Sequence, residues 1–127
     1  MNTTLVVSRV EPYSPGDECA SVTLRSNLGE ITAFCWGREL KEGDTIKNRL
    51  SALDAEARAA YLQDWPEEEK EEKSKERLEQ IGPHAYRGVG RVIDPNSGLI
   101  EVLGFKIELG DVPCDEAVEF ECMRVDV

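Results

Sequence analysis

An alternation of apolar and polar residues constrains the fold of this chain more than any other feature of its sequence. The stretch CASVTLRS at 19–26 places apolar residues at every second position, and EITAFCW at 30–36 does the same. Successive side chains of a strand point to opposite faces, so this period of two predicts two strands that each bury one face. Residues 27–29, Asn-Leu-Gly, separate the stretches and predict a tight reversal. We therefore expect a β-hairpin over 19–36.

Further strands are predicted on both sides of this hairpin. The stretch TTLVVSRVEPY at 3–13 alternates in the same way, and a turn at 42–44 precedes a short strand. In the last third, turns at 94–98 and 110–113 divide three more segments that have strand character. They are AYRGVGRVID (85–94), GLIEVLGFKIEL (98–109) and AVEFECMRVDV (117–127).

The middle of the chain, 52–82, changes to a composition that favours helices. The stretch DAEARAAYLQDW at 54–65 is rich in helix formers, and Asp54 is placed to cap its first turn. A second helix is predicted from a cap at Asp64 to the Gly-Pro pair at 82–83. Glutamates in its first turn are stabilised by the positive end of the helix dipole. These two helices form an insertion between two β halves.

The order of these elements predicts an α+β, mainly β, fold in a single domain over residues 1–127. Its parts are a β half at 3–50, the helical insertion at 52–82 and a β half at 85–127. The segments KEGDTI and VEFECMRVDV resemble strands of OB-fold and SH3-like barrels. This resemblance implies a small barrel of about six strands with the two-helix insertion between its halves.

Two pairs of segments are loosely repeated between the halves. The segment VSRVEP at 7–12 resembles GRVIDP at 90–95, and the stretch at 29–44 is loosely mirrored by the stretch at 98–111. A duplication would produce such matches, and so would chance similarity between strand-turn segments. Both explanations stay open at this point. In either case the repeat favours one β-system whose two halves are separated by the helices.

The net charge limits the classes of partner. The chain has 15 Lys and Arg against 26 Asp and Glu, which gives a net charge of −11 at pH 7. Such a surface repels nucleic-acid phosphates and anionic lipids, and it favours basic proteins. The alternative is that the charge serves only solubility. Residues 64–80 hold eight acidic and four basic side chains, so most of the negative charge lies outside this stretch.

Catalytic and metal-binding patterns are absent from the sequence. It contains no phosphate-binding loop, no H-E-x-x-H and no G-x-S-x-G motif. Its one histidine, His84, follows Gly-Pro and reads as a surface or capping residue. Four cysteines without a C-x-x-C pair predict buried, reduced thiols rather than a zinc site: Cys19, Cys35, Cys114 and Cys122. We therefore expect no enzyme, no metal and no cofactor.

The expected location is the cytosol. No apolar run reaches the roughly 18 residues that a membrane-spanning helix needs, so no membrane association is expected. The first residues, MNTTLVVSRVEP, lack the basic and apolar segments of a signal peptide.

The barrel resemblance implies one alternative function, the binding of single-stranded nucleic acid or of a small ligand. That function uses a basic groove with stacking aromatic side chains. Basic residues are scattered in this sequence and outnumbered, so nucleic acid is not the favoured partner. A barrel would have to gather them into one strip from Arg9, Arg25, Arg38, Lys47, Arg49, Arg87 and Arg91.

The sequence favours an acidic protein-binding module. We expect an immunity protein or inhibitor that neutralises a basic, nuclease-like partner in a bacterium, because opposite charges speed and tighten such association. A third hypothesis is an accessory subunit of a larger assembly, and the oligomeric state stays open. The predicted partner-binding residues are Glu67, Glu68, Glu71, Glu72, Asp44 and Asp64, with Trp36 and Trp65 as aromatic anchors. In the competing interpretation, the acidic helix is only a solvated connection.

Overall fold

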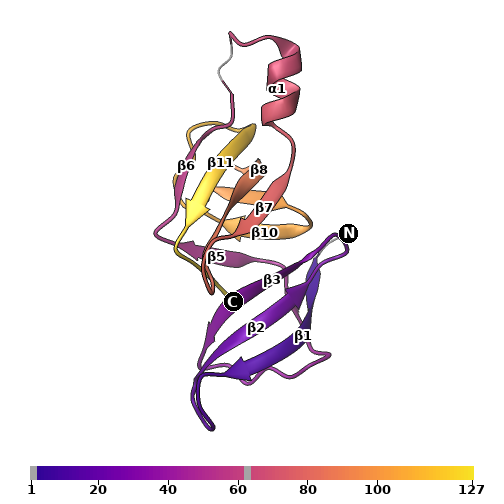
Figure 1. Ribbon diagram of the computed structural model, residues 1–127, viewed down its shortest axis with the longest axis vertical. Helices are drawn as coiled ribbons and strands as arrows, with labels where there is room; N and C mark the ends of the chain where they lie inside the picture. Colours follow the sequence, from indigo (N-terminus) through magenta and orange to yellow (C-terminus); the bar gives the residue numbers. More distant parts are fainter. Residues whose placement is uncertain (1–2, 62–63) are drawn as a thin grey trace.

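Strands dominate the computed structural model, which describes residues 3–61 and 64–127 (Figure 1). These residues form twelve strands and one helix. The first six strands are β1 (Thr4–Pro12), β2 (Cys19–Arg25), β3 (Glu30–Trp36), β4 (Thr45–Lys47), β5 (Leu50–Leu53) and β6 (Glu56–Ala59). Helix α1 (Glu67–Lys73) follows, and then β7 (Arg77–Gln80), β8 (Tyr86–Asp94), β9 (Leu99–Val102), β10 (Phe105–Glu108), β11 (Ala117–Cys122) and β12 (Arg124–Asp126). The expectation of about six strands with a two-helix insertion is therefore wrong.

The hairpin predicted from the alternation is confirmed. Strands β2 and β3 pair antiparallel along their whole length, and the Ser26 amide donates to the Gly29 carbonyl at 2.9 Å to close the turn. The alternating apolar side chains of both strands are buried: Ala20, Val22, Leu24, Ile31, Ala33 and Cys35. Burial of this one face fixes the register, since a shift by one residue would expose every one of these side chains.

The strand order of the sheet is nearly the same when it is read from either end. The order is β4-β1-β2-β3-β12-β5-β10-β9-β8-β11-β6, and β7 pairs with β8 off this path. If β1 to β5 are matched in turn with β8 to β12, the run β4-β1-β2-β3-β12 corresponds to β11-β8-β9-β10-β5. Each half thus gives its fifth strand to the other half, since β12 pairs parallel with β3 and β5 pairs parallel with β10. Strands β5 and β12 meet antiparallel at the centre.

The two halves also match in their local pairing. Strands β1 and β8 each have nine residues and one register irregularity. In the hairpins that follow them, Leu24 opposes Ile31 and Ile100 opposes Ile107 at the same separation along the chain. This correspondence agrees with the repeat in the sequence, and it is what a duplication with exchanged strands would produce.

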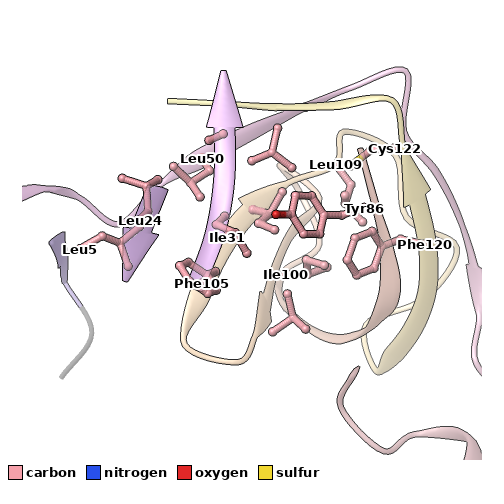
Figure 2. Close-up of a cluster of buried hydrophobic side chains, with 14 of the residues drawn as sticks. Leu5, Leu24, Ile31, Leu50, Tyr86, Ile100, Phe105, Leu109, Phe120 and Cys122 are labelled. Atoms are coloured by element: carbon pink, nitrogen blue, oxygen red, sulfur yellow. The ribbon is translucent and has the colours of Figure 1, made fainter. Parts of the chain in front are cut away.

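Buried side chains from both halves form one hydrophobic cluster. Figure 2 shows Leu24 and Ile31 of the first half on one side, and Tyr86 and Phe120 of the second half on the other. Phe105 is fully buried within the same cluster. The exchange of strands places the two halves against each other, so neither half buries its apolar face alone.

Strand β6 replaces the first predicted helix, 54–65. Asp54 has a φ of 51°, in the left-handed region that aspartate adopts more readily than most residues, so it turns the chain instead of capping a helix. Strand β6 then pairs antiparallel with β11. Pairing with an existing sheet overrides the weak helix preference of this alanine-rich stretch. Residues 62–63 of the predicted helix lie outside the described residues.

The second predicted helix is shorter than expected. Helix α1 is preceded by Pro66 and has no side-chain cap, so Asp64 does not serve as its cap. No residue of α1 is buried, and a helix without a packed face is limited to what local interactions support. The residues expected to continue it form β7, which pairs with β8.

The predicted OB-like or SH3-like barrel is also wrong. The sheet is open and ends at β4 and β6. Strands β7 and β9 pair with successive parts of one edge of β8, while β11 takes its other edge. Two glycines permit this crowding, because a Cβ on Gly88 would lie 2.1 Å from the Arg77 carbonyl oxygen and one on Gly90 would lie 3.0 Å from that of Glu101. The glycine pair therefore serves close strand approach.

Candidate protein-binding surface

The predicted contact residues on the helix lie at one end of the molecule. Helix α1 projects beyond β6, β11 and β7, at the end far from β1, β2 and β3 (Figure 1). Its four predicted residues are all exposed: Glu67, Glu68, Glu71 and Glu72. Glu67 forms an ion pair with Lys70 at 3.6 Å, and Glu72 forms one with Lys75 at 2.8 Å. Exposed pairs of this kind contribute little to stability, so these carboxylates are accessible to a partner.

The other predicted contact residues are spread over the molecule. Asp64 is exposed and Trp65 is half-buried directly before α1. Trp36 is 66% exposed, but it ends β3 in the other half of the molecule. Asp44 has a local role, because its carboxylate accepts the Lys41 amide at 2.9 Å in the turn before β4. The structure thus brings Asp64 and Trp65 beside the helical glutamates and leaves Trp36 and Asp44 apart from them.

A groove of about 590 Å³ crosses the four strands β6, β11, β8 and β7. It is lined by Glu56, Ala57, Arg58, Arg77, Leu78, Glu79, Arg87, Gly88, Glu119, Phe120 and Glu121. Most of these side chains are charged, which distinguishes the groove from the mostly apolar pockets that hold small molecules.

Antiparallel pairing arranges the charged side chains of the groove in two rows. Residues directly opposed on neighbouring antiparallel strands lie on the same face of the sheet. The first row consists of Glu56, Glu121, Arg87 and Glu79, and the second of Arg58, Glu119 and Arg77, with the apolar Val89 between the last two. Arg58 bonds Glu119 at 2.7 Å, and Arg87 bonds Glu79 at 2.9 Å. The hydrogen bond from Arg58 lowers the pKa of Glu119, so this carboxylate stays charged.

The groove holds four glutamates against three arginines, so Arg58 and Arg87 offset part of the charge of Glu56 and Glu121 without pairing with them. Glu56 and Glu121 oppose each other on β6 and β11, and neither forms an ion pair within the ranges that the structure describes. Like charges in directly opposed positions are destabilising, and a cation bound between them removes that cost. The alternation V-E-F-E-C predicts that Glu121 points away from the core. Neither residue was among the predicted contact residues, and Glu56 falls in the stretch that was predicted as a helix.

The strands of this groove and the segments next to them in the chain are rich in acidic residues. The segments 56–80 and 114–122 contain thirteen acidic and five basic side chains. Strand β8, which runs between them, adds two arginines and one aspartate, so this end carries −7 of the net −11. In the sequence, most of the net charge lies outside 64–80. In the fold, the acidic strands β6 and β11 lie at the same end of the molecule as that stretch (Figure 1).

Most of the basic residues that a nucleic-acid strip would use form ion pairs within the molecule. Five of the seven are paired with carboxylates: Arg9 with Glu11, Arg25 with Glu30, Arg49 with Glu108, Arg87 with Glu79 and Arg91 with Glu101. The positive charge of these five arginines is thus offset locally.

A second cluster of polar and aromatic side chains joins the two halves on the outer face of β2 and β3. His84 is only 9% exposed, so the expectation of a surface residue is wrong. Its Nε2 lies 2.8 Å from the Ser21 Oγ, and its ring packs against those of Tyr13 and Phe34 with centroids 6.2 and 5.8 Å apart. Burial, with the nearby Arg124 guanidinium, lowers the pKa of His84. This histidine is therefore neutral at pH 7.

Arg124 and Asp126 of β12 complete this cluster. The Arg124 guanidinium lies 4.2 Å from the centre of the Phe34 ring and donates to both carboxylate oxygens of Asp126 at 2.6 and 3.0 Å. Because Arg124 holds Asp126, no carboxylate bonds the His84 imidazole within the described ranges. The Ser21–His84 contact therefore lacks the third member of a catalytic triad.

Two of the four thiols have a raised pKa. Burial raises the pKa of Cys122, while desolvation and the carboxylates of Asp17 and Glu18 raise that of Cys19, so both stay protonated. Among residues 3–61 and 64–127, no three His, Cys, Asp or Glu side chains are placed to hold a metal ion. The helix in these ranges is too short to cross a membrane.

Comparisons with known proteins give no relative for this chain. No protein-family model matches it, and no curated protein or solved structure shows significant similarity. The function must therefore be inferred from the surface itself.

Proposed function

We propose that this chain is an acidic protein-binding module whose groove across β6, β11, β8 and β7 receives a basic protein. The opposed carboxylates of Glu56 and Glu121 bind an arginine or lysine side chain of that partner, and the exposed glutamates of α1 attract it. Neutralisation of a basic, nuclease-like protein by an immunity protein or inhibitor is the biological form that fits this chemistry. The cytosol belongs to the proposal, because the four cysteines are free thiols.

The observation that carries this proposal is the opposition of Glu56 and Glu121 in a groove whose other charges are mostly paired. Two like charges in directly opposed positions destabilise the strand pair. A partner cation converts this repulsion into two charge-assisted hydrogen bonds, which are about twice as strong as neutral ones. The surrounding net charge of −7 speeds encounter with cationic proteins.

Nucleic acid is a poor alternative for the same surface. Phosphates would meet the acidic end, and two of the three arginines that line the groove, Arg58 and Arg87, are already engaged by glutamates. Neutralising phosphates requires Lys and Arg side chains that are available to replace counterions.

The test is capture of partners from native lysate on the immobilised chain, with variants that separate the groove from bulk charge. The groove variant is Glu56→Gln with Glu121→Gln. The matched control is Glu39→Gln with Glu42→Gln, which changes the net charge equally at exposed positions outside the groove. We expect wild type and the control to retain a basic protein at low salt and the groove variant to lose it. High salt should elute this protein from wild type.

Two outcomes would contradict the proposal. Equal capture by wild type, groove variant and control would show that only bulk charge matters. Capture of no basic protein at low salt would remove the proposed partner class.

A further inference from the structure

We infer that the basic partner presents an extended segment, which adds as a further strand to the free edge of β6. This inference rests on the proposed function, because it concerns the form of the partner at the same surface. It is carried by a different observation, namely the backbone groups on the outer side of β6 and the charge pattern beside them.

Strand β6 ends the sheet, and among the described strands it pairs only with β11. The Ala60 amide donates to the Ala117 carbonyl at 3.1 Å, which shows which backbone groups face β11. In an antiparallel pair, the residues whose backbone N–H and C=O groups face the partner strand alternate along the chain. The backbone groups of Arg58 and Glu56 therefore also bond to β11. The backbone groups of Ala57 and Ala59 therefore point outward, and no partner for them lies within the described residues. They form an edge to which an extended peptide can bond.

Side chains on this edge specify which peptide fits. A residue opposite Glu56 on an added strand lies in the row of Glu56 and Glu121, and a residue opposite Arg58 lies in the row of Arg58 and Glu119. Complementary charges are therefore basic opposite Glu56 and acidic or neutral opposite Arg58. The matching segment has a basic residue and an acidic residue two positions apart, with β-forming residues between them.

The same features exclude indiscriminate pairing. Strand β6 has four residues, and its Glu56 and Arg58 are exposed charges. Short, charged edges resist strand addition by chains that do not match them. Ala57 and Ala59 have small side chains, which leave room for a neighbouring strand. The edge is thus selective for a segment with the stated charge pattern.

The probe is the peptide acetyl-Thr-Arg-Val-Glu-Val-Arg-Thr-amide, whose charge pattern fits β6 in either direction. The matched control is acetyl-Thr-Arg-Pro-Glu-Pro-Arg-Thr-amide, which carries the same charges but has lost two backbone donors and strand preference. Binding to the full chain is measured by titration calorimetry at low salt. Hydrogen exchange of the Ala57 and Ala59 amides is followed with and without peptide.

The variant that isolates the edge is Ala59→Pro. It removes an outward N–H that no described group uses, and proline is tolerated where the N–H of an edge strand faces solvent. We expect at least tenfold weaker binding of the valine peptide to Ala59→Pro and of the proline peptide to wild type. We also expect slower exchange of the Ala57 amide when the valine peptide is bound.

The outcomes separate this inference from the proposed function. Equal binding of both peptides, or unchanged exchange at Ala57 and Ala59, overturns strand addition while leaving charge-driven docking in place. Absence of binding by either peptide overturns strand addition as well, and the capture experiment then decides the proposed function alone. If Ala59→Pro unfolds, the comparison of the two peptides on wild type still decides the inference.

Discussion

Replacing Tyr86 by phenylalanine tests how the two halves are joined. The Tyr86 hydroxyl accepts the Thr32 amide at 2.7 Å, and Tyr86 is 4% exposed. The hydrogen bond that closes the β2–β3 turn shows which backbone amides of β3 face β2, and amides alternate between the two edges of a strand. The Thr32 amide therefore lies on the edge of β3 that faces away from β2. Strand β12 reaches that edge only at Phe34, so Tyr86 supplies the partner that Thr32 otherwise lacks.

The expected loss follows from leaving this amide without a partner. Tyr86→Phe keeps the ring and creates no cavity, so the cost is that of an unsatisfied, partly buried donor, at most about 1–3 kcal/mol in the free energy of unfolding. For a chain of this size each kcal/mol lowers the melting temperature by about 4 °C. Urea unfolding and differential scanning calorimetry measure both quantities.

Tyr13→Phe is the matched control, because the same atom is removed from a side chain that is 55% exposed. It should change the free energy of unfolding by less than about 0.5 kcal/mol. A Tyr86→Phe variant as stable as Tyr13→Phe would refute the reasoning that this hydroxyl links the halves.

Three further predictions concern the glycines and the histidine. Gly98 has a φ of 69°, and a Cβ there would lie 1.8 Å from the Gly110 carbonyl oxygen. Gly98→Ala should therefore lower the free energy of unfolding by about 2–4 kcal/mol. Gly16 also has a positive φ but has open space at its Cβ, so Gly16→Ala should lower the free energy of unfolding by about 1 kcal/mol. Gly88→Ala should displace β7, seen as faster amide exchange at 77–80, because its Cβ would lie 2.1 Å from a β7 carbonyl; unchanged protection there would contradict this. The pKa of His84 is lower in the folded chain than in the unfolded chain, so on acidification the unfolded chain takes up the proton at a higher pH than the folded chain. The stability that neutral His84 contributes is therefore complete above pH 6.5 and is lost as the pH falls from there through the pKa of the folded chain. His84→Gln should flatten the urea-midpoint profile between pH 7.5 and 5, and an unchanged slope would contradict the assignment.

The alternation of apolar residues predicted the hairpin over 19–36 and the strand character of the last third, because burial of one face is a local property of a strand. The helix over 54–65 was predicted wrongly for a related reason. Its alanines and glutamates favour a helix locally, whereas pairing of β6 with β11 depends on residues about sixty positions away. Asp54 carries a turn signal as well as a capping signal, and only the structure decides between them.

Local sequence patterns could not predict the order of the strands in the sheet. The repeat between 7–12 and 90–95 indicated two related halves, yet nothing in either segment shows that β5 and β12 are exchanged between them. The groove follows from this arrangement, because it needs β6, β7 and β11 around β8. Sequence reasoning therefore identified the acidic composition and proposed the glutamates of α1, whereas Glu56 and Glu121 of the proposed groove were not among its candidates.

The most direct test of the docking surface is a map of where a cationic peptide touches the chain. Titration of hexa-arginine into the ¹⁵N-labelled protein, followed by amide chemical shifts at low salt, gives this map. The account predicts saturable shifts concentrated at 56–59 and 119–121, abolished by Glu56→Gln with Glu121→Gln and reversed by salt. Shifts spread evenly over all exposed acidic residues, or centred on Trp36 at the other end, would contradict it.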